Sequence, residues 1–166
     1  MNPKTRMITI LGVSAAAAMV LSYVESLIPV SFAVPGIKLG LANVVALFLI
    51  MKLDWKAASA VNAVRVLLSS LLFGNAASLA YSAAGAALSM LVMALMKRSS
   101  RFSAIGISTA GAVSHNVGQI LMAIALTGTK QIAWWLPPLV VSGAVTGVAI
   151  GALGALLISK IPLRTK

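Results

Sequence analysis

The sequence contains no cysteine and only two acidic residues, Glu25 and Asp54. The lack of cysteine excludes disulfides, iron–sulfur ligation and thiol catalysis. One histidine, His115, cannot supply the three or four ligands of a transition-metal site. Two carboxylates far apart in the sequence disfavour paired acid–base catalysis and carboxylate-bound magnesium, and the chain has no phosphate-binding G-x-x-x-x-G-K-[ST] loop. We therefore expect no metal, no cofactor and no enzymatic activity.

Charge is scarce as well, at 9% of residues, whereas apolar residues make up 60% and the mean hydropathy is +1.04. These values lie outside the range of soluble proteins. Ten of the thirteen lysines and arginines form clusters at the ends of apolar runs, namely Lys4/Arg6, Lys52/Lys56, Lys97/Arg98/Arg101 and Lys160/Arg164/Lys166. A nucleic-acid-binding protein would instead mix cations with aromatics in one patch. The pattern indicates a protein of the lipid bilayer without a nucleic-acid partner.

Six apolar runs are candidates for membrane-spanning helices, each of which needs about 20 mostly apolar residues. They cover residues 7–28, 37–51, 55–73, 76–96, 102–126 and 136–158. The first run has 22 residues, which is too long for the apolar core of a signal peptide, so we expect a retained helix. The sequence therefore predicts an all-α integral membrane protein, with residues 1–166 forming a single transmembrane domain.

The cation clusters orient these helices, because cytoplasmic loops of membrane proteins carry an excess of lysine and arginine. With six spans, all four clusters fall on one side, which predicts a multi-pass protein of the cell membrane with both termini in the cytoplasm. Only Lys38 and Lys130 remain on the other side. Trp134 and Trp135 suit the outer membrane interface, and Trp55 suits the inner one.

The second run is unusually short. Residues 37–51 would give a helix of about 22 Å, less than a hydrocarbon core of about 30 Å. The preceding residues 29–36 are apolar but contain two prolines and a glycine. They could form a loop that dips into the outer half of the membrane, which requires a protein or water-filled environment, or an ordinary exposed loop.

Small residues recur every four positions along several runs, which lets helix backbones approach closely. The stripes are Ser14/Ala18/Ser22, Gly106/Ala110/Ser114/Gly118 and Gly143/Gly147/Gly151. Most of them should pack the bundle. The first stripe could instead face outward and dock a partner membrane protein.

A few polar side chains lie inside the apolar runs, where they are costly and mark functional sites by default. They are Glu25, Asn43, Asn62, Arg65, His115, Asn116 and Gln119. Counted from the predicted helix ends, nearly all lie in the outer half, so we expect a polar cavity that opens outward above an apolar floor, with Lys38 and Glu25 at its rim. Its cations favour a polar or anionic small-molecule ligand. The alternative is that Arg65 and Glu25 form a structural ion pair and the amides cross-link helices.

Three segments resemble one protein family. They are VPGIKLGLAN at 34–43, VRVLLSSLLFG at 64–74 and GAVSHNVGQ at 111–119. Together they resemble the Gx transporter family, also labelled heptaprenyl diphosphate synthase component I, over nearly the whole chain. That family is similar to the substrate-binding S components of energy-coupling factor (ECF) vitamin transporters.

The resemblance implies a six-helix bundle with an extracellular ligand pocket and a small-residue motif on the first helix. It also implies partners, namely a transmembrane coupling protein that carries two ATPases. The synthase label suggests a different role, as a non-catalytic membrane subunit of prenyl diphosphate or menaquinone biosynthesis, because the aspartate-rich D-D-x-x-D motif that holds magnesium is missing from the sequence. A purely structural scaffold is the third alternative.

Overall fold

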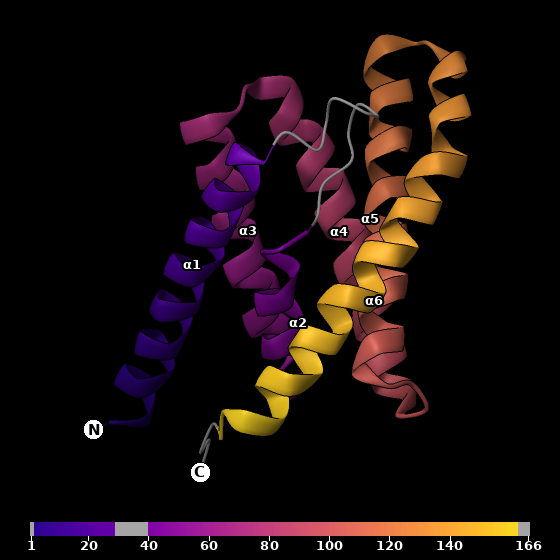
Figure 1. Ribbon diagram of the computed structural model, residues 1–166. Coiled ribbons are helices and arrows are strands. Elements are labelled where there is room, and N and C mark those ends of the chain that lie inside the picture. The colour runs from indigo at the N-terminus through magenta and orange to yellow at the C-terminus, as the bar shows by residue number, and fades with distance from the viewer. Residues whose placement is uncertain (1, 29–39, 163–166) are drawn as a thin grey trace.

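The computed structural model describes residues 2–28 and 40–162, and within these every regular element is a helix (Figure 1). The elements are α1 (Pro3–Leu27), α2 (Asn43–Lys52), α3 (Trp55–Phe73), α4 (Ala76–Ser99), α5 (Ala104–Thr127), the 3₁₀ helix η2 (Lys130–Trp135) and α6 (Leu136–Lys160). All of the α-helices except α2 are long and apolar enough to cross a membrane. The predicted all-helical fold is thus confirmed in the described part of the chain.

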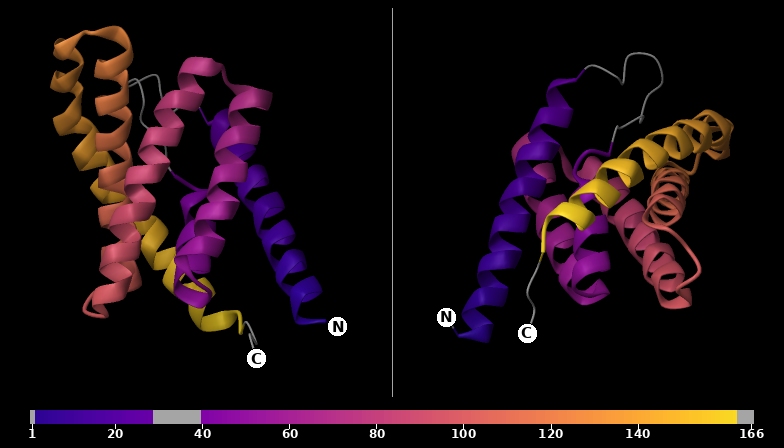
Figure 2. Two further views of the ribbon diagram at one scale, coloured as in Figure 1. Left: turned by 180° about the vertical axis from the view of Figure 1, so that it is seen from behind. Right: turned by 60° about the horizontal axis from the view of Figure 1, so that its bottom comes forward.

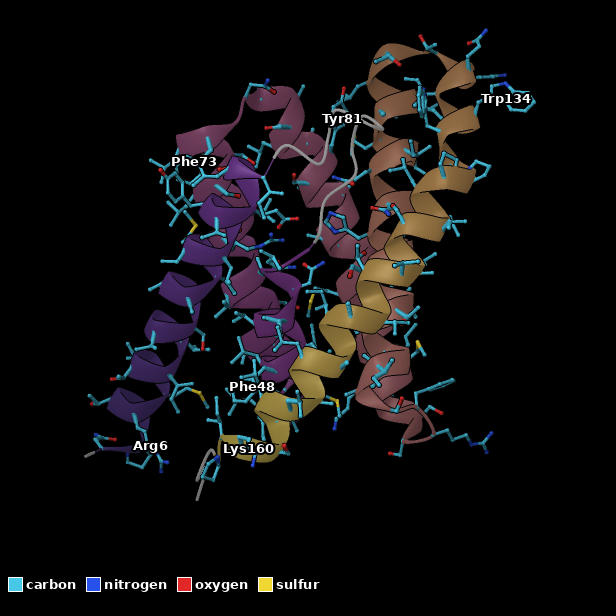
Figure 3. All side chains as sticks on the ribbon, viewed as in Figure 1. Arg6, Phe48, Phe73, Tyr81, Trp134 and Lys160 are labelled. Carbon is cyan, nitrogen blue, oxygen red and sulfur yellow. The ribbon has the colours of Figure 1, made fainter. Side chains whose placement is uncertain are left out.

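Successive helices run in alternate directions, so both termini lie at the same end of the bundle (Figure 1). The turns between α2 and α3 and between α4 and α5 lie at this end too. The described members of the four cation clusters therefore gather there, as the labels on Arg6 and Lys160 show in Figure 3. We call it the cation-rich end. Trp134, which is 84% exposed, lies at the opposite end.

The helix bounds agree closely with the predicted runs except at α2. α3 covers the predicted residues 55–73. α4 and α6 extend a few residues beyond their predicted ends, and α5 begins and ends slightly later than predicted. The prediction of a helix beginning at residue 37 is wrong over Gly40–Ala42, where the chain turns with a positive φ of 71° at Gly40. Residues 37–39 and the predicted membrane loop at 29–36 lie outside the described residues.

α2 forms the centre of the bundle although it is its shortest α-helix. Val44, Ala46, Leu47, Leu49 and Ile50 are buried, and α2 contacts each of the other five α-helices. Its ten residues span about 15 Å, which is half of a hydrocarbon core of about 30 Å. α2 therefore fills the interior only toward the cation-rich end.

Glycines bring α4, α5 and α6 into close contact. A Cβ atom on Gly118 of α5 would lie 2.8 Å from the carbonyl oxygen of Ala84 in α4. Along α6, a Cβ on Gly147 would lie 2.6 Å from Cα of Thr109, and one on Gly151 would lie 2.7 Å from Cα of Ile105. Since the neighbours are backbone atoms, no larger side chain fits without a shift of the helix.

α1 packs mainly against α3, and its small-residue stripe faces the bundle. Ala18 is only 1% exposed, and Ser14 and Ser22 are half-buried. The ring of Tyr23 also contacts the ring of Phe73 near the end of α3. Ala18 is thus engaged inside the bundle, whereas the docking role of Ser14, Ala18 and Ser22 stays a prediction.

Two polar residues outside the cavity cap helices. The Asp54 carboxylate accepts a hydrogen bond from the Ala57 amide at 2.7 Å at the start of α3. At α4, Asn75 accepts from the Ser78 amide at 2.8 Å, and Ser78 in turn accepts from the Asn75 amide at 2.9 Å. Such caps satisfy backbone donors that the helix leaves unpaired.

We expect Gly147→Ala to destabilise the protein by about 1–3 kcal/mol, because the added methyl group overpacks the α5–α6 contact. Gly12→Ala in α1 is the matched control. No atom lies within 4 Å of its added Cβ, so the gain in helix propensity should leave stability unchanged or slightly higher. Thermal denaturation in detergent would measure both, and equal melting temperatures would contradict the close packing.

Candidate functional site

A cavity of about 330 Å³ lies in the middle of the bundle, and each of the six α-helices contributes to its wall. We call it the central cavity. It begins among residues at helix ends opposite the cation-rich end, including Ser26, Phe73 and Ser78, and reaches down to Asn43 at the start of α2. The cavity therefore occupies the space that α2 is too short to fill.

Five of the eight predicted ligand-binding residues line the central cavity. They are Glu25, Asn43, Arg65, His115 and Asn116, from α1, α2, α3 and α5. Asn62 and Gln119 are not among its lining residues, and Lys38 lies outside the described residues. The five predicted residues thus come from four of the six α-helices that line the cavity.

Arg65 is the cation of this site. Its Nε atom donates a hydrogen bond to Oδ1 of Asn62 at 3.0 Å, which fixes the side chain on the face of α3 that lines the cavity. Within the described residues its two Nη atoms have no hydrogen-bond partner. These groups are strong, fixed donors. They remain available to a molecule inside the cavity.

Glu25 is the carboxylate of the site, and it holds the backbone ahead of α2. Its Oε1 atom accepts a hydrogen bond from the amide of Gly40 at 2.5 Å. The carboxylate attracts Arg65 electrostatically but forms no ion pair with it in the described structure. The alternative of a structural Arg65–Glu25 ion pair is therefore not supported, and both groups face the cavity.

The polar residues of α5 fix its position between α4 and α6. Asn116 donates from Nδ2 to the carbonyl oxygen of Leu139 at 2.6 Å, next to Gly143, which leaves room for the amide. His115 and Gln119 lie against Gly85 of α4, where a Cβ would meet both side chains within 3.0 Å. Asn116 and Gln119 thus pack at helix contacts, which matches the cross-linking alternative for these amides.

Hydroxyl groups supply much of the remaining cavity wall, and the sequence analysis missed them. They are Ser22, Ser26, Ser69, Ser70, Ser78, Ser82, Ser89, Ser108 and Thr146. Three of them, Ser78, Ser82 and Ser89, follow each other at spacings of four and seven along α4, which places them on one helix face. That spacing indicates a polar helix face. Serine is also a small residue that packs helices, so the spacing alone does not show that this face lines a cavity.

Two of these hydroxyls show that the predicted apolar floor of the cavity is wrong. Ser108 lies four residues from the start of α5 at the cation-rich end, or about 6 Å along the helix. Ser89 and Ser108 are both buried and line the cavity together with Met93 and Ile150. The polar lining therefore extends well past the outer half.

Ser22 Oγ is fully buried and has no hydrogen-bond partner in the described part of the chain.

The central cavity combines a few charged groups with hydroxyl and amide groups. Its described fully charged groups are one guanidinium and one carboxylate, surrounded by hydroxyl and amide groups. Nowhere in residues 2–28 and 40–162 do three histidine, cysteine, aspartate or glutamate side chains gather as metal ligands would. The arrangement suits recognition of one small ligand by charge and hydrogen bonds.

Asn62 instead lines a second depression, the α3/α4 groove, on the outside of the bundle. It is 7% exposed. Val66 contributes to both the groove and the central cavity. The wall between the two spaces is therefore one helix thick, and the Asn62–Arg65 hydrogen bond crosses it.

Glu25→Ala should destabilise the protein by roughly 1.5–3 kcal/mol, the range for a hydrogen bond to a charged group. Glu25→Gln keeps an acceptor for the Gly40 amide and should lose less. Thermal denaturation of the three proteins in detergent would measure the difference. If the alanine and glutamine variants melted together with the wild type, the Glu25–Gly40 contact would have no structural role.

Comparison with known families gives one match. A family model described as heptaprenyl diphosphate synthase component I matches residues 14–157. The matched region includes all five predicted residues that line the central cavity. No match was found among curated proteins or among solved structures.

Proposed function

The chain belongs to the heptaprenyl diphosphate synthase component I family, and from this premise we propose that it is an integral membrane protein that binds a small polar or anionic molecule in the central cavity. The observation that carries the proposal is the cavity itself. Its wall includes Arg65, whose Nη atoms have no hydrogen-bond partner within residues 2–28 and 40–162, together with many hydroxyl groups inside an apolar bundle. Polar groups are costly in such surroundings unless they serve a function.

The proposed membrane orientation rests on charge. The described members of the four cation clusters lie at one end of the bundle, whereas Lys130 lies at the other. By the positive-inside rule the cation-rich end faces the cytoplasm, with both termini. The central cavity, which begins at the opposite end, would then receive its ligand from outside the cell.

The ligand's charge follows from two groups at the lower part of the cavity wall. Arg65 supplies a full positive charge, and the N-terminus of α2 lines the same cavity at Asn43. Helix N-termini carry a partial positive charge of roughly half a unit, and interrupted helices in transporters use such termini to face anionic substrates. The negative charge of Glu25 offsets part of this positive field. A ligand with one anionic group is therefore favoured over a ligand with two.

The role that suits this site best is that of an S component of an ECF-type transporter, with a coupling protein and ATPases supplying the energy. Six helices, with a polar cavity open at the end opposite the termini, support this role. The docking face would be the exposed side of α1, because only 6% of its apolar window is buried. Gly12 and Ala16 are exposed there at a spacing of four, which permits close helix approach.

A second candidate function follows from the family's description, which names prenyl diphosphate synthesis. In that case the chain would be a non-catalytic membrane subunit of prenyl diphosphate or menaquinone biosynthesis. Two carboxylates in the whole sequence support a role beside the catalyst rather than as the catalyst. Co-purification with a soluble aspartate-rich synthase, rather than with ATPases, would favour this function.

The orientation can be tested directly because the natural chain has no cysteine. Gln131→Cys lies at the opposite end and Ser99→Cys at the cation-rich end, and both native residues are exposed. A membrane-impermeant maleimide added to intact cells should label Gln131→Cys but label Ser99→Cys only after permeabilisation. The reverse pattern would show that the cavity opens to the cytoplasm.

The ligand can be tested through Arg65. We expect protein purified from native membranes to carry a small molecule, detectable by native mass spectrometry. Arg65→Ala should retain roughly tenfold to a hundredfold less of it, because a hydrogen bond to a charged group contributes about 1.5–3 kcal/mol. Lys130→Ala is the control. It removes a cation from the end of the bundle at which the cavity begins, but Lys130 does not line the cavity. Unchanged retention by Arg65→Ala would remove Arg65 from the binding site.

A further inference from the structure

Asn62 is a buried amide of α3 that lies outside the central cavity. It is 7% exposed and lines the α3/α4 groove, between two helices that meet at their connecting turn and diverge toward the cation-rich end (Figure 2, left). Within residues 2–28 and 40–162 its side chain makes one hydrogen bond, which it accepts from Nε of Arg65. The amide of Asn116, by contrast, reaches a carbonyl oxygen on another helix. The polar contact of Asn62 therefore serves Arg65 and does not tie two helices together.

The hydrogen bond to Asn62 restricts the direction of the Arg65 guanidinium. This group is planar and rigid, so a partner at Nε limits where the two Nη atoms can point. Arg65 lines the central cavity, and its Nη atoms have no hydrogen-bond partner in the described part of the chain. Asn62 thus immobilises a long side chain of the cavity wall before any ligand arrives. Such preorganisation raises the affinity for a ligand.

Arg65 and Glu25 carry opposite charges in the wall of one cavity, yet they form no ion pair in the described structure. Opposite charges attract each other strongly where the dielectric constant is low. A neutral partner holds each of them instead. Asn62 accepts from Nε of Arg65 at 3.0 Å, and the amide of Gly40 donates to the Glu25 carboxylate at 2.5 Å. An arginine released from Asn62 could move toward Glu25, and the resulting ion pair would neutralise the positive charge of the cavity.

We propose that Asn62 is a positioning residue for the ligand of the central cavity, because it keeps Arg65 from pairing with Glu25 and presents the two Nη atoms to a carboxylate. This inference rests on the proposed function and adds to it the class of the anionic group and a residue outside the cavity. A carboxylate offers two acceptor oxygens to two Nη donors and has one charge. A phosphate monoester carries about 1.5–2 negative charges at pH 7, and the charge of Glu25 disfavours the second of them.

The probe is 4-azidobenzoate, a carboxylate that cross-links to neighbouring groups on illumination, with the full-length protein in phosphatidylcholine nanodiscs. Peptide mass spectrometry measures the cross-links to the cavity-lining segments of α3 and α5. The uncharged 4-azidobenzyl alcohol measures binding without the carboxylate, so the ratio of the two yields gives the preference for the charged probe. We expect the wild type to prefer the carboxylate about tenfold or more, as a hydrogen bond to a charged group allows.

Asn62→Ala should lower this preference roughly fivefold to tenfold, because Arg65 loses its hydrogen bond, whereas labelling by the alcohol should persist. Asn62→Asp keeps the acceptor and the side-chain shape but brings a negative charge to Nε. It should lower the preference as well, and it decides the question if Asn62→Ala does not fold. Glu25→Gln removes the carboxylate with which a released Arg65 would pair. In that background the loss caused by Asn62→Ala should be about threefold smaller or less, whereas a residue needed only for packing would cause the same loss in both backgrounds.

Ser59→Ala is the matched control, because Ser59 lies on α3 and lines the same groove but does not line the central cavity. It should keep the wild-type preference. The inference is overturned if both Asn62 variants keep that preference, if Ser59→Ala loses as much, or if Glu25→Gln leaves the loss in Asn62→Ala unchanged. Stronger cross-linking by 4-azidophenyl phosphate than by 4-azidobenzoate would overturn the assignment of a carboxylate. A wild type that prefers neither the charged nor the uncharged probe would instead overturn the proposed binding of an anion, so the two failures are distinguishable.

Discussion

The length of α2 is the constraint on which the rest of the structure depends. A central helix of ten residues reaches only about 15 Å, so it cannot supply apolar side chains to both halves of the bundle. The half without helix must be lined by side chains of the surrounding helices, and these include hydroxyl, amide and charged groups beside apolar ones such as Phe73. The Glu25–Gly40 hydrogen bond anchors the chain where the helix would otherwise have continued. The short α2 thus leaves space for the central cavity, whose lining also continues beside α2 to Ser89 and Ser108.

The polar groups in the bundle fall into two kinds once their hydrogen bonds are followed. Asp54 and Asn75 complete the starts of α3 and α4, and Asn116 ties α5 to α6. Arg65 is different, because one nitrogen holds the side chain in place through Asn62 while the other two have no hydrogen-bond partner among the residues that the structure describes. A buried donor without a partner is costly, which is why such a group indicates a binding site more strongly than a satisfied amide does.

The sequence was sufficient to predict the helices and most of the charged lining, because long apolar runs and isolated charges are strong local signals. It predicted α3 to the residue and identified Glu25, Asn43, Arg65, His115 and Asn116. It could not predict which way neighbouring residues of one helix face. Asn62 and Arg65 share a side of α3 by spacing, yet they line different spaces. The direction of the Ser14/Ala18/Ser22 stripe was undetermined for the same reason, since a small residue suits either a bundle contact or a partner.

Because glycines bring α4, α5 and α6 into close contact, separating these helices should cost more free energy than displacing α1. Separating α5 from α6 would break backbone-close contacts at Gly147 and Gly151, so their separation would be costly. α1 shares no such contact: its Gly12 has open space around it, and most of its surface is unburied. Figure 1 shows it at the edge of the bundle. The wall of the cavity that carries Ser22 and Glu25 is therefore attached to the bundle through fewer close contacts than the wall that carries His115 and Asn116.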